Sequence, residues 1–281
     1  MPTEQAVALL LDEDRRAVAA AARETKAIAR AARLVADSLA HGRDSVFAGA
    51  GTSGRMGVLE AAECPPTFGS NPRRIRAVMA GGAQSVFRAK EGAEDRADHG
   101  AKVGARLRKG DVLIGISASS VTPFVRAALR AARANGARTV LVTCAKVPGL
   151  GALADVVIAI ATGPEVLTGS TRLKAGSATK AVLNAITTAA MLRLGKAYGN
   201  LMVDLRRTSA KLVDRARRIV MAGAGIDAAT ADRLLDASSG EAKTAIVMAA
   251  LQLDARAARL RLLKAGGHVH KALSRRTSTS A

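Results

Sequence analysis

Short apolar runs alternate with stretches of helical periodicity over the first 160 residues of the chain. Residues 3–41 precede them and carry apolar residues at helical spacing without Gly or Pro, which predicts a helix. The runs, each predicted to be a buried strand, are Asp44–Ala50, Ile75–Met79, Val112–Ser117, Thr139–Thr143 and Val156–Ile160. The helical stretches between them are Gln84–Glu94, Asp98–Leu107 and Pro123–Asn135. This alternation predicts βαβ units and a five-stranded parallel sheet flanked by helices on both faces.

The pattern changes after Gly163, where only helical periodicity remains. Thr171–Leu194 has the character of a long buried helix. Asp204–Ala222 has the alternating faces of an amphipathic helix. The α/β part of the chain is therefore expected to end in helices alone.

A small helical subdomain closes the chain. Three short helical segments follow Ile226, with interruptions near residues 238–240 and 253–254. Asp227 and Asp254 stand where helix N-caps are expected, because a carboxylate can accept the first free N–H groups of a helix. We therefore expect an N-terminal helix packing on the main domain, an α/β domain, a three-helix subdomain and a disordered tail. Their ranges are 1–42, 43–222, 223–273 and 274–281.

Composition limits the class of protein. Of the 281 residues, 49% are hydrophobic but only 2% are aromatic, which predicts an aliphatic core in one large domain with a small appendage. Residues 1–13 lack a signal-peptide pattern, and no apolar run is long enough to span a membrane, so a cytoplasmic protein is expected. Two cysteines form no disulfide framework, and the four histidines show no metal-ligand spacing.

The net charge of +20, from 43 Lys and Arg against 23 Asp and Glu, raises the question of nucleic-acid binding. Basic residues are spread along the whole chain, and one Tyr and four Phe offer few stacking platforms for bases. A basic, solvated surface is the simpler interpretation. Specific nucleic-acid binding would need a concentrated positive face and a strong dependence on salt.

The turn after the first predicted strand is suited to an anion. Gly51, Thr52, Ser53 and Gly54 follow the strand and lead into a helix. Ligands of parallel sheets bind outside the carboxyl ends of the strands, where glycines allow close approach and helix N–H groups attract phosphate. The turn lacks the Gly-Lys-Ser/Thr of a Walker loop and departs from G-x-G-x-x-G. The alternative is a tight turn that binds nothing.

A second hydroxyl-rich turn follows the third predicted strand. It contains Ser117, Ser119, Ser120 and Thr122, and Pro123 stands where the first turn of a helix is expected. Each hydroxyl taken alone has a simpler role as a helix cap. Two turns of the same kind at neighbouring strand ends predict that one phosphate is held from both sides.

Two glutamates are candidates for acid–base chemistry. Glu63 precedes Pro65-Pro66, a pair that we expect to end the helix, and Glu94 stands in an acidic segment further on. Paired carboxyl groups can act as general acid and base, although most glutamates are solvated surface groups. A third candidate segment spans residues 163–176, where Glu165, Ser170 and Lys174 are expected to meet substrate or to begin a helix.

Several blocks together resemble the N-acetylmuramic acid 6-phosphate etherases, an SIS (sugar isomerase) family related to glucokinase regulatory protein. The similarity extends from about residue 10 to residue 273. The blocks are Ala48–Leu59, Glu63–Gly69, Glu91–Asp95, Gly163–Gly176, Tyr198–Asp204 and Lys211–Ala216. The Glu-Cys-Pro-Pro-Thr-Phe-Gly and Thr-Gly-Ser-Thr-Arg-Leu-Lys blocks are specific, because a generic SIS domain lacks them.

The resemblance implies a lyase of the cell-wall amino sugar recycling route. It would cleave the D-lactyl ether of N-acetylmuramic acid 6-phosphate to N-acetylglucosamine 6-phosphate and D-lactate by elimination and then water addition. The family's catalytic glutamates fall on Glu63, favoured as the acid, and Glu94, favoured as the base. Its phosphate ligands fall on hydroxyls of the two turns. A homodimer without metal or organic cofactor is implied.

The chain departs from the family pattern at three places. Ser120-Val121 replaces the usual Gly-Arg pair, Ser209 stands where Asn is usual, and the stretch that usually precedes the family's first helix is absent. Serine tolerates positive φ poorly, and the missing Arg removes a fork-shaped donor for phosphate. The first change gives some support to an alternative, a non-catalytic SIS sensor of sugar phosphates, whereas the presence of both glutamates favours the enzyme. An SIS isomerase of another phosphosugar is a further alternative.

Overall fold

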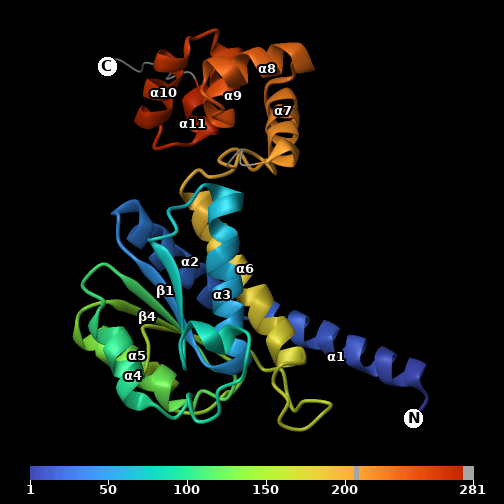
Figure 1. Ribbon diagram of the computed structural model, residues 1–281, viewed down its shortest axis with the longest axis vertical. Coiled ribbons are helices and arrows are strands. Elements are labelled where there is room, and N and C mark those ends of the chain that lie inside the picture. Colours follow the sequence, from blue (N-terminus) through green and yellow to red (C-terminus); the bar gives the residue numbers. More distant parts are fainter. Residues whose placement is uncertain (206–208, 275–281) are drawn as a thin grey trace. The chain divides into compact units, whose positions relative to one another are not determined.

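The computed structural model describes residues 1–205 and 209–274. These residues form two compact units. The first comprises Met1–Glu63 and Asn71–Ala190, and the second comprises Cys64–Ser70 and the chain from Met191 onward. Figure 1 shows the chain as a ribbon, with the α-helices and the strands β1 and β4 labelled.

The first unit is an α/β domain around a five-stranded sheet. All neighbouring strands are parallel, in the order β2-β1-β3-β4-β5. The strands are β1 (Ser45–Gly49), β2 (Ile75–Met79), β3 (Val112–Ile116), β4 (Arg138–Thr143) and β5 (Val156–Ala159). The helices that begin in this unit are α1 (Thr3–Ala22), α2 (Thr25–Ala40), α3 (Gly51–Phe68), α4 (Ala97–Ala105), α5 (Pro123–Ala134) and α6 (Lys174–Arg193), with 3-10 turns η1 (Ala83–Val86) and η2 (Leu150–Ala152). All five predicted strands and the fold class are confirmed.

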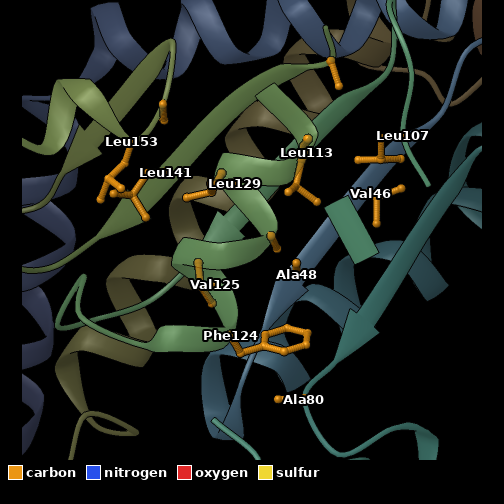
Figure 2. Close-up of a cluster of buried hydrophobic side chains, with 14 of the residues drawn as sticks. Val46, Ala48, Ala80, Leu107, Leu113, Phe124, Val125, Leu129, Leu141 and Leu153 are labelled. Carbon is orange, nitrogen blue, oxygen red and sulfur yellow. The ribbon is translucent and has the colours of Figure 1, made fainter. Parts of the chain in front are cut away.

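Aliphatic side chains fill the layer between the sheet and α4 and α5. Figure 2 shows Val46, Leu113 and Leu141 of the strands facing Val125 and Leu129 of α5. On the other face, α3 lies so close to the sheet that a Cβ on its Gly57 would be 2.9 Å from the Cβ of Phe47. Helices therefore cover both faces, as the uniformly apolar strands required.

The N-terminal helix is divided, contrary to the single helix predicted over 3–41. Helix α1 ends at Ala22 and α2 begins at Thr25. The hydroxyl of Thr25 donates to the carbonyl oxygen of Ala22 at 2.5 Å, which satisfies a carbonyl at the end of α1. The break between the two helices falls at residues that include no Gly or Pro. The sequence pattern therefore gave no signal that the helix would be divided there.

The helix predicted over Gln84–Glu94 is wrong. The segment is a single 3-10 turn followed by irregular backbone, and Gly92 has φ +72°. The guanidinium of Arg55 donates to the carbonyl oxygens of Val86 and Ser85, at 2.7 and 2.9 Å. In a helix these two carbonyl oxygens would accept from N–H groups of the same segment. Here they accept from the Arg55 side chain of α3 instead.

Helix α3 continues through Pro65 and Pro66 to Phe68, so the predicted end at the double proline is also wrong. Proline has a helical φ although it lacks an N–H, and the helical hydrogen bonding continues where the Gly69 N–H donates to the Pro65 carbonyl at 3.0 Å. Gly69, with φ +61°, then ends the helix. Glu63 accordingly lies inside a regular helix.

The second unit is helical around its own apolar core. Its helices are α7 (Ala210–Ala224), α8 (Ala228–Ala237), α9 (Ala242–Leu251), α10 (Ala255–Lys264) and α11 (Val269–Leu273). Asp227 and Asp254 cap α8 and α10, as predicted, by accepting from the N–H groups of Thr230 and Ala257. The structure adds α11 to the three short segments expected and groups α7 with them, rather than with the α/β domain. Of the predicted tail 274–281, only Ser274 is among the described residues.

Candidate functional site

The candidate site gathers at the carboxyl edge of the sheet. Gly49 ends β1 and is paired in register with Ile116, which ends β3, so the two hydroxyl-rich turns leave the sheet side by side. Helix α6 begins at the same edge, because a Cβ on its Gly176 would lie 3.8 Å from the Cγ2 of Thr52. The edge thus brings together turns that are far apart in the sequence.

The first turn is shorter than the sequence suggested, because α3 begins at Gly51. Thr52 and Ser53 lie in its first turn, where N–H groups have no acceptor within the helix, whereas the Gly54 N–H donates to the Ala50 carbonyl at 3.1 Å. A Cβ on Gly54 would lie 2.7 Å from the Gly49 carbonyl oxygen, so this glycine lets helix and strand meet. Gly51 has φ +53°, and its missing Cβ would face open space. The arrangement fits a helix N-terminus that is open to an anion.

The second turn is held by its own hydroxyls. The hydroxyls of Ser117 and Thr122 lie 2.8 Å apart, and the Ser119 hydroxyl accepts from the Val121 N–H at 3.4 Å. Ser120 is buried with φ +63°, so the serine keeps a left-handed conformation that glycine adopts at little cost. Val121, in place of the family's arginine, is 60% exposed. Pro123 begins α5, as predicted.

Lys174 is the buried cation at this edge. Its residue is 4% exposed, and its ammonium is ion-paired with Glu13 of α1, whose pKa the hydrogen bond from Lys174 lowers. A second contact joins the same two helices, because the Ser177 hydroxyl of α6 donates to the Asp14 carboxylate of α1 at 3.0 Å. The sequence analysis missed these acidic residues of α1, although Asp12-Glu13-Asp14 is an acidic triplet in a basic chain.

Glu165 and Ser170 have local structural roles. The Oε1 atom of Glu165 accepts from the N–H of Ala175 at 3.0 Å, so the carboxylate caps α6. Its Oε2 atom is buried and has no hydrogen-bond partner among the described residues. Ser170 takes part in a turn through its backbone, donating to Leu167 and accepting from Leu173.

Glu94 lines a cavity of about 200 Å³ at the same edge. Gly51 and Arg55 of α3 contribute to the wall, together with Lys90 and Glu91. The backbone of Glu94 is fixed because its carbonyl accepts from the Phe124 N–H, at the start of α5, at 3.0 Å. A carboxylate therefore stands beside the turn that the sequence predicts to bind an anion.

Glu63 is not part of this cavity. It is exposed and lies toward the far end of α3, one turn beyond the buried Glu60. The residues after Glu63 in the Glu-Cys-Pro-Pro-Thr-Phe-Gly block belong to the second unit. There a Cβ on Gly69 would lie 2.5 Å from the Asp204 carbonyl oxygen, so this block and the Tyr198–Asp204 block meet.

Asp204 forms ion pairs with two lysines of the second unit. Its Oδ2 lies 2.8 Å from the ammonium groups of both Lys196 and Lys243. Burial lowers the pKa of Lys243, and Asp204 opposes that shift. A cavity of about 420 Å³ lies beside Asp204 and Lys243. The Tyr198–Asp204 block is therefore explained by packing within this unit, and Ser209, at the family's Asn position, caps α7.

No three His, Cys, Asp or Glu side chains within residues 1–205 and 209–274 are grouped to hold a metal ion. No helix in the same ranges is both long and apolar enough to cross a membrane. Cys144 is half-buried against α6, and burial raises the pKa of its thiol.

The sheet order and the site at its carboxyl edge define an SIS-domain protein. Residues 27–133 match the glucokinase regulatory protein N-terminal SIS domain, and residues 92–189 match the SIS domain. A phosphoheptose isomerase from Neisseria gonorrhoeae is 21% identical, with a TM-score of 0.49 over 67% of this chain and 98% of that one.

Sequence relatives identify the family. The N-acetylmuramic acid 6-phosphate etherase of Geobacillus thermodenitrificans is 46% identical over 97% of this chain and 93% of its own length. That of Cutibacterium acnes is 48% identical over 97% of this chain and 90% of its own. The chain belongs to the N-acetylmuramic acid 6-phosphate etherase family, which confirms the resemblance found in its sequence.

Proposed function

We propose that this protein cleaves the D-lactyl ether of N-acetylmuramic acid 6-phosphate to give N-acetylglucosamine 6-phosphate and D-lactate. The similarity to etherases over nearly the whole chain carries this proposal. It is supported by a carboxylate, Glu94, in a cavity beside an anion-binding turn. The proposal includes a cytoplasmic location and a homodimer, as the family resemblance implies.

Phosphate binding is assigned to the carboxyl edge. The N–H groups of the first turn of α3 and the hydroxyls of Thr52 and Ser53 face a phosphate from one side. Ser119 and Thr122 approach it from the neighbouring turn. The anion site holds the sugar so that its ring carbons reach the cavity of Glu94.

The reaction is assigned to two carboxyl groups. Glu94 removes the proton on C2, the C3–O bond breaks, and a carboxylic acid at Glu63 protonates the departing lactyl oxygen. The deprotonated Glu63 then takes a proton from water as its oxygen adds to C3, and Glu94 returns a proton to C2. The sum is consumption of one water and release of one lactate.

The test is D-lactate release by the intact protein beside Glu94→Gln and Glu63→Gln. Loss of a general acid or base is expected to slow the reaction by about 10²–10⁴-fold. Asp236→Asn, an exposed carboxylate change in α8, is the matched control and should leave the rate unchanged. Exchange of the C2 hydrogen with solvent deuterium separates the roles, because only Glu94→Gln should lose it.

Failure of the intact protein to release D-lactate would contradict the etherase assignment. If the same folded protein still bound the sugar phosphate, the result would favour the sensor alternative. The specific feature behind that alternative is the second turn, where Ser120-Val121 lacks the family's glycine and arginine.

A further inference from the structure

Two side chains in the wall of the Glu94 cavity have no part in the proposed phosphate site or in the acid–base pair. The exposed Lys90 forms no ion pair with a carboxylate of residues 1–205 and 209–274. The hydroxyl of Ser85 is buried and has no hydrogen-bond partner in the same ranges, although the residue is only 3% exposed. Buried hydroxyls without a partner are uncommon in folded proteins, and a ligand oxygen would complete the hydrogen bonding of this one.

Gly81 brings these two side chains together. A Cβ on this glycine would lie 2.2 Å from the Ser85 Oγ and 3.3 Å from the Lys90 Cδ, so both side chains occupy the space that the glycine leaves. The backbone of Ser85 is fixed, because its N–H donates to Gly82 at 3.1 Å and its carbonyl accepts from Arg55 at 2.9 Å. The hydroxyl is therefore held beside the stem of the lysine before any ligand arrives.

The neighbouring arginines are already occupied. Arg55 donates to the carbonyl oxygens of Val86 and Ser85. Arg96 donates from its Nε and Nη2 atoms to the two carboxylate oxygens of Asp98, both at 2.9 Å. Within the described part of the chain, Lys90 is thus the cation of this wall that has the capacity to pair with an incoming anion.

A second cavity, of about 350 Å³, adjoins the cavity of Glu94. Lys90, Glu91 and Ala93 line both of them, and Arg96 and His99 line the second alone. The cavity of Glu94, at about 200 Å³, is smaller than the roughly 300–1,000 Å³ of ordinary ligand pockets. A ligand that extends beyond the first cavity at this wall therefore passes Lys90.

The proposed reaction determines which part of the substrate comes to this wall. The lactyl ether is attached to C3, next to the C2 carbon whose proton Glu94 removes, so the lactyl group lies beside the residues around Glu94. Its carboxylate is negative, and the wall already has the carboxylates of Glu91 and Glu94. Like charges repel at short range, so binding of the lactyl group requires a cation at this place.

We infer that Lys90 and Ser85 form a subsite for the carboxylate of the lactyl group. The Lys90 ammonium pairs with the carboxylate, and the Ser85 hydroxyl donates a hydrogen bond to it. The inference rests on the proposed etherase activity. The subsite selects sugar phosphates that carry the acidic ether over the product, N-acetylglucosamine 6-phosphate, because the product offers no partner to either group.

Binding calorimetry in a Glu94→Gln background, which turns the substrate over slowly, tests the subsite. Lys90→Met should weaken the binding of N-acetylmuramic acid 6-phosphate by about 10–100-fold, and Ser85→Ala should weaken it by about 2–10-fold, the usual worth of a charged and a neutral hydrogen bond. Neither change should alter the binding of N-acetylglucosamine 6-phosphate, which also shows that the variants are folded. Lys102→Met, at an exposed lysine of α4 outside both cavities, is the matched control and should change neither affinity.

Kinetics with Glu94 retained provide the second measurement. Lys90→Met should raise the KM for D-lactate release and leave kcat nearly unchanged, because the carboxylate is bound equally in the ground state and the transition state. A lower kcat at constant KM would place Lys90 at the reacting atoms instead and overturn the inference.

The two sugars separate failure of the subsite from failure of the etherase assignment. Equal weakening of both sugars by Lys90→Met, or weakening of neither, would overturn the subsite even if the intact protein releases D-lactate. If the intact protein releases no D-lactate but Lys90→Met still weakens only N-acetylmuramic acid 6-phosphate, the subsite is supported and the etherase activity is refuted.

Discussion

The hydroxyl of Thr187 in α6 donates to the buried carboxylate of Glu60 in α3, across 127 positions of the chain. Asn184 donates to the other oxygen of Glu60 at 2.6 Å, and its amide oxygen accepts from Lys180 at 2.9 Å, in the orientation that satisfies both partners. These contacts connect α3, which begins at Gly51, to α6, which begins at Lys174. Burial raises the pKa of Glu60, while the Thr187 bond and Lys180 oppose the shift.

Glu60→Gln should change how stability depends on pH. The folded pKa of Glu60 lies above its ordinary value of 4.5, so its contribution is fully present below that value and is lost as pH rises through the folded pKa. The glutamine variant does not titrate there. Urea unfolding at pH 4 and pH 8 should show the stability difference moving in the variant's favour at the higher pH. An unchanged difference would mean that Glu60 titrates normally.

Thr187→Val should destabilise the protein by about 1–3 kcal/mol at neutral pH, because a buried carboxylate loses a donor. Thr188→Val, which changes an exposed hydroxyl at the next position of α6, is the control. If urea unfolding shows the same loss of unfolding free energy in both variants, the hydrogen bond to Glu60 does not contribute to stability.

Ser120→Gly should stabilise the fold by about 0.5–1 kcal/mol. The residue has φ +63°, and relief of roughly 1–2 kcal/mol of left-handed strain exceeds the entropy that glycine adds to the unfolded chain. Ser120→Val should have the opposite and larger effect, because a β-branched side chain tolerates this conformation worst. Thermal unfolding of both variants tests this explanation. If the serine hydroxyl stabilises the fold instead, both substitutions should lower the melting temperature.

Gly54→Ala should destabilise by about 1–3 kcal/mol, as overpacked substitutions do. Its Cβ would lie 2.7 Å from the Gly49 carbonyl oxygen, so the start of α3 must shift relative to the end of β1, at the proposed phosphate site. Gly151→Ala is the matched control, since nothing lies within 4 Å of its Cβ. Calorimetry of inorganic phosphate binding should show weaker binding for Gly54→Ala alone. Equal behaviour of the two variants would refute a tight contact.

Glu13→Gln and Lys174→Met should not act independently. Each leaves a charged group of the Glu13–Lys174 pair without its partner, so each should lower the melting temperature. The double variant should lose less than the sum of the two. Glu4→Gln, in the exposed first turn of α1, should leave the melting temperature unchanged. Strict additivity of the two losses would show that the contact contributes nothing in solution.

The sequence determined the features that depend on neighbouring residues. Short, largely apolar runs defined all five strands, and the two hydroxyl-rich turns at the ends of β1 and β3 followed from strand direction. Asp227 and Asp254 were identified as caps because a cap acts within its own turn. The family was evident from blocks such as Glu63–Gly69, whose residues are specific in type and order.

Tertiary structure decided what depends on distant partners. Arg55 donates hydrogen bonds to the carbonyl oxygens of Ser85 and Val86, in a segment that has helical periodicity but is not a helix. Glu13 meets Lys174 and Glu60 meets Thr187 only because helices remote in sequence pack together. The family resemblance paired Glu63 with Glu94, but the direction of α3 places Glu63 away from the cavity that Glu94 lines. Local patterns fix which residues a helix contains, whereas its direction across the sheet fixes what those residues can reach.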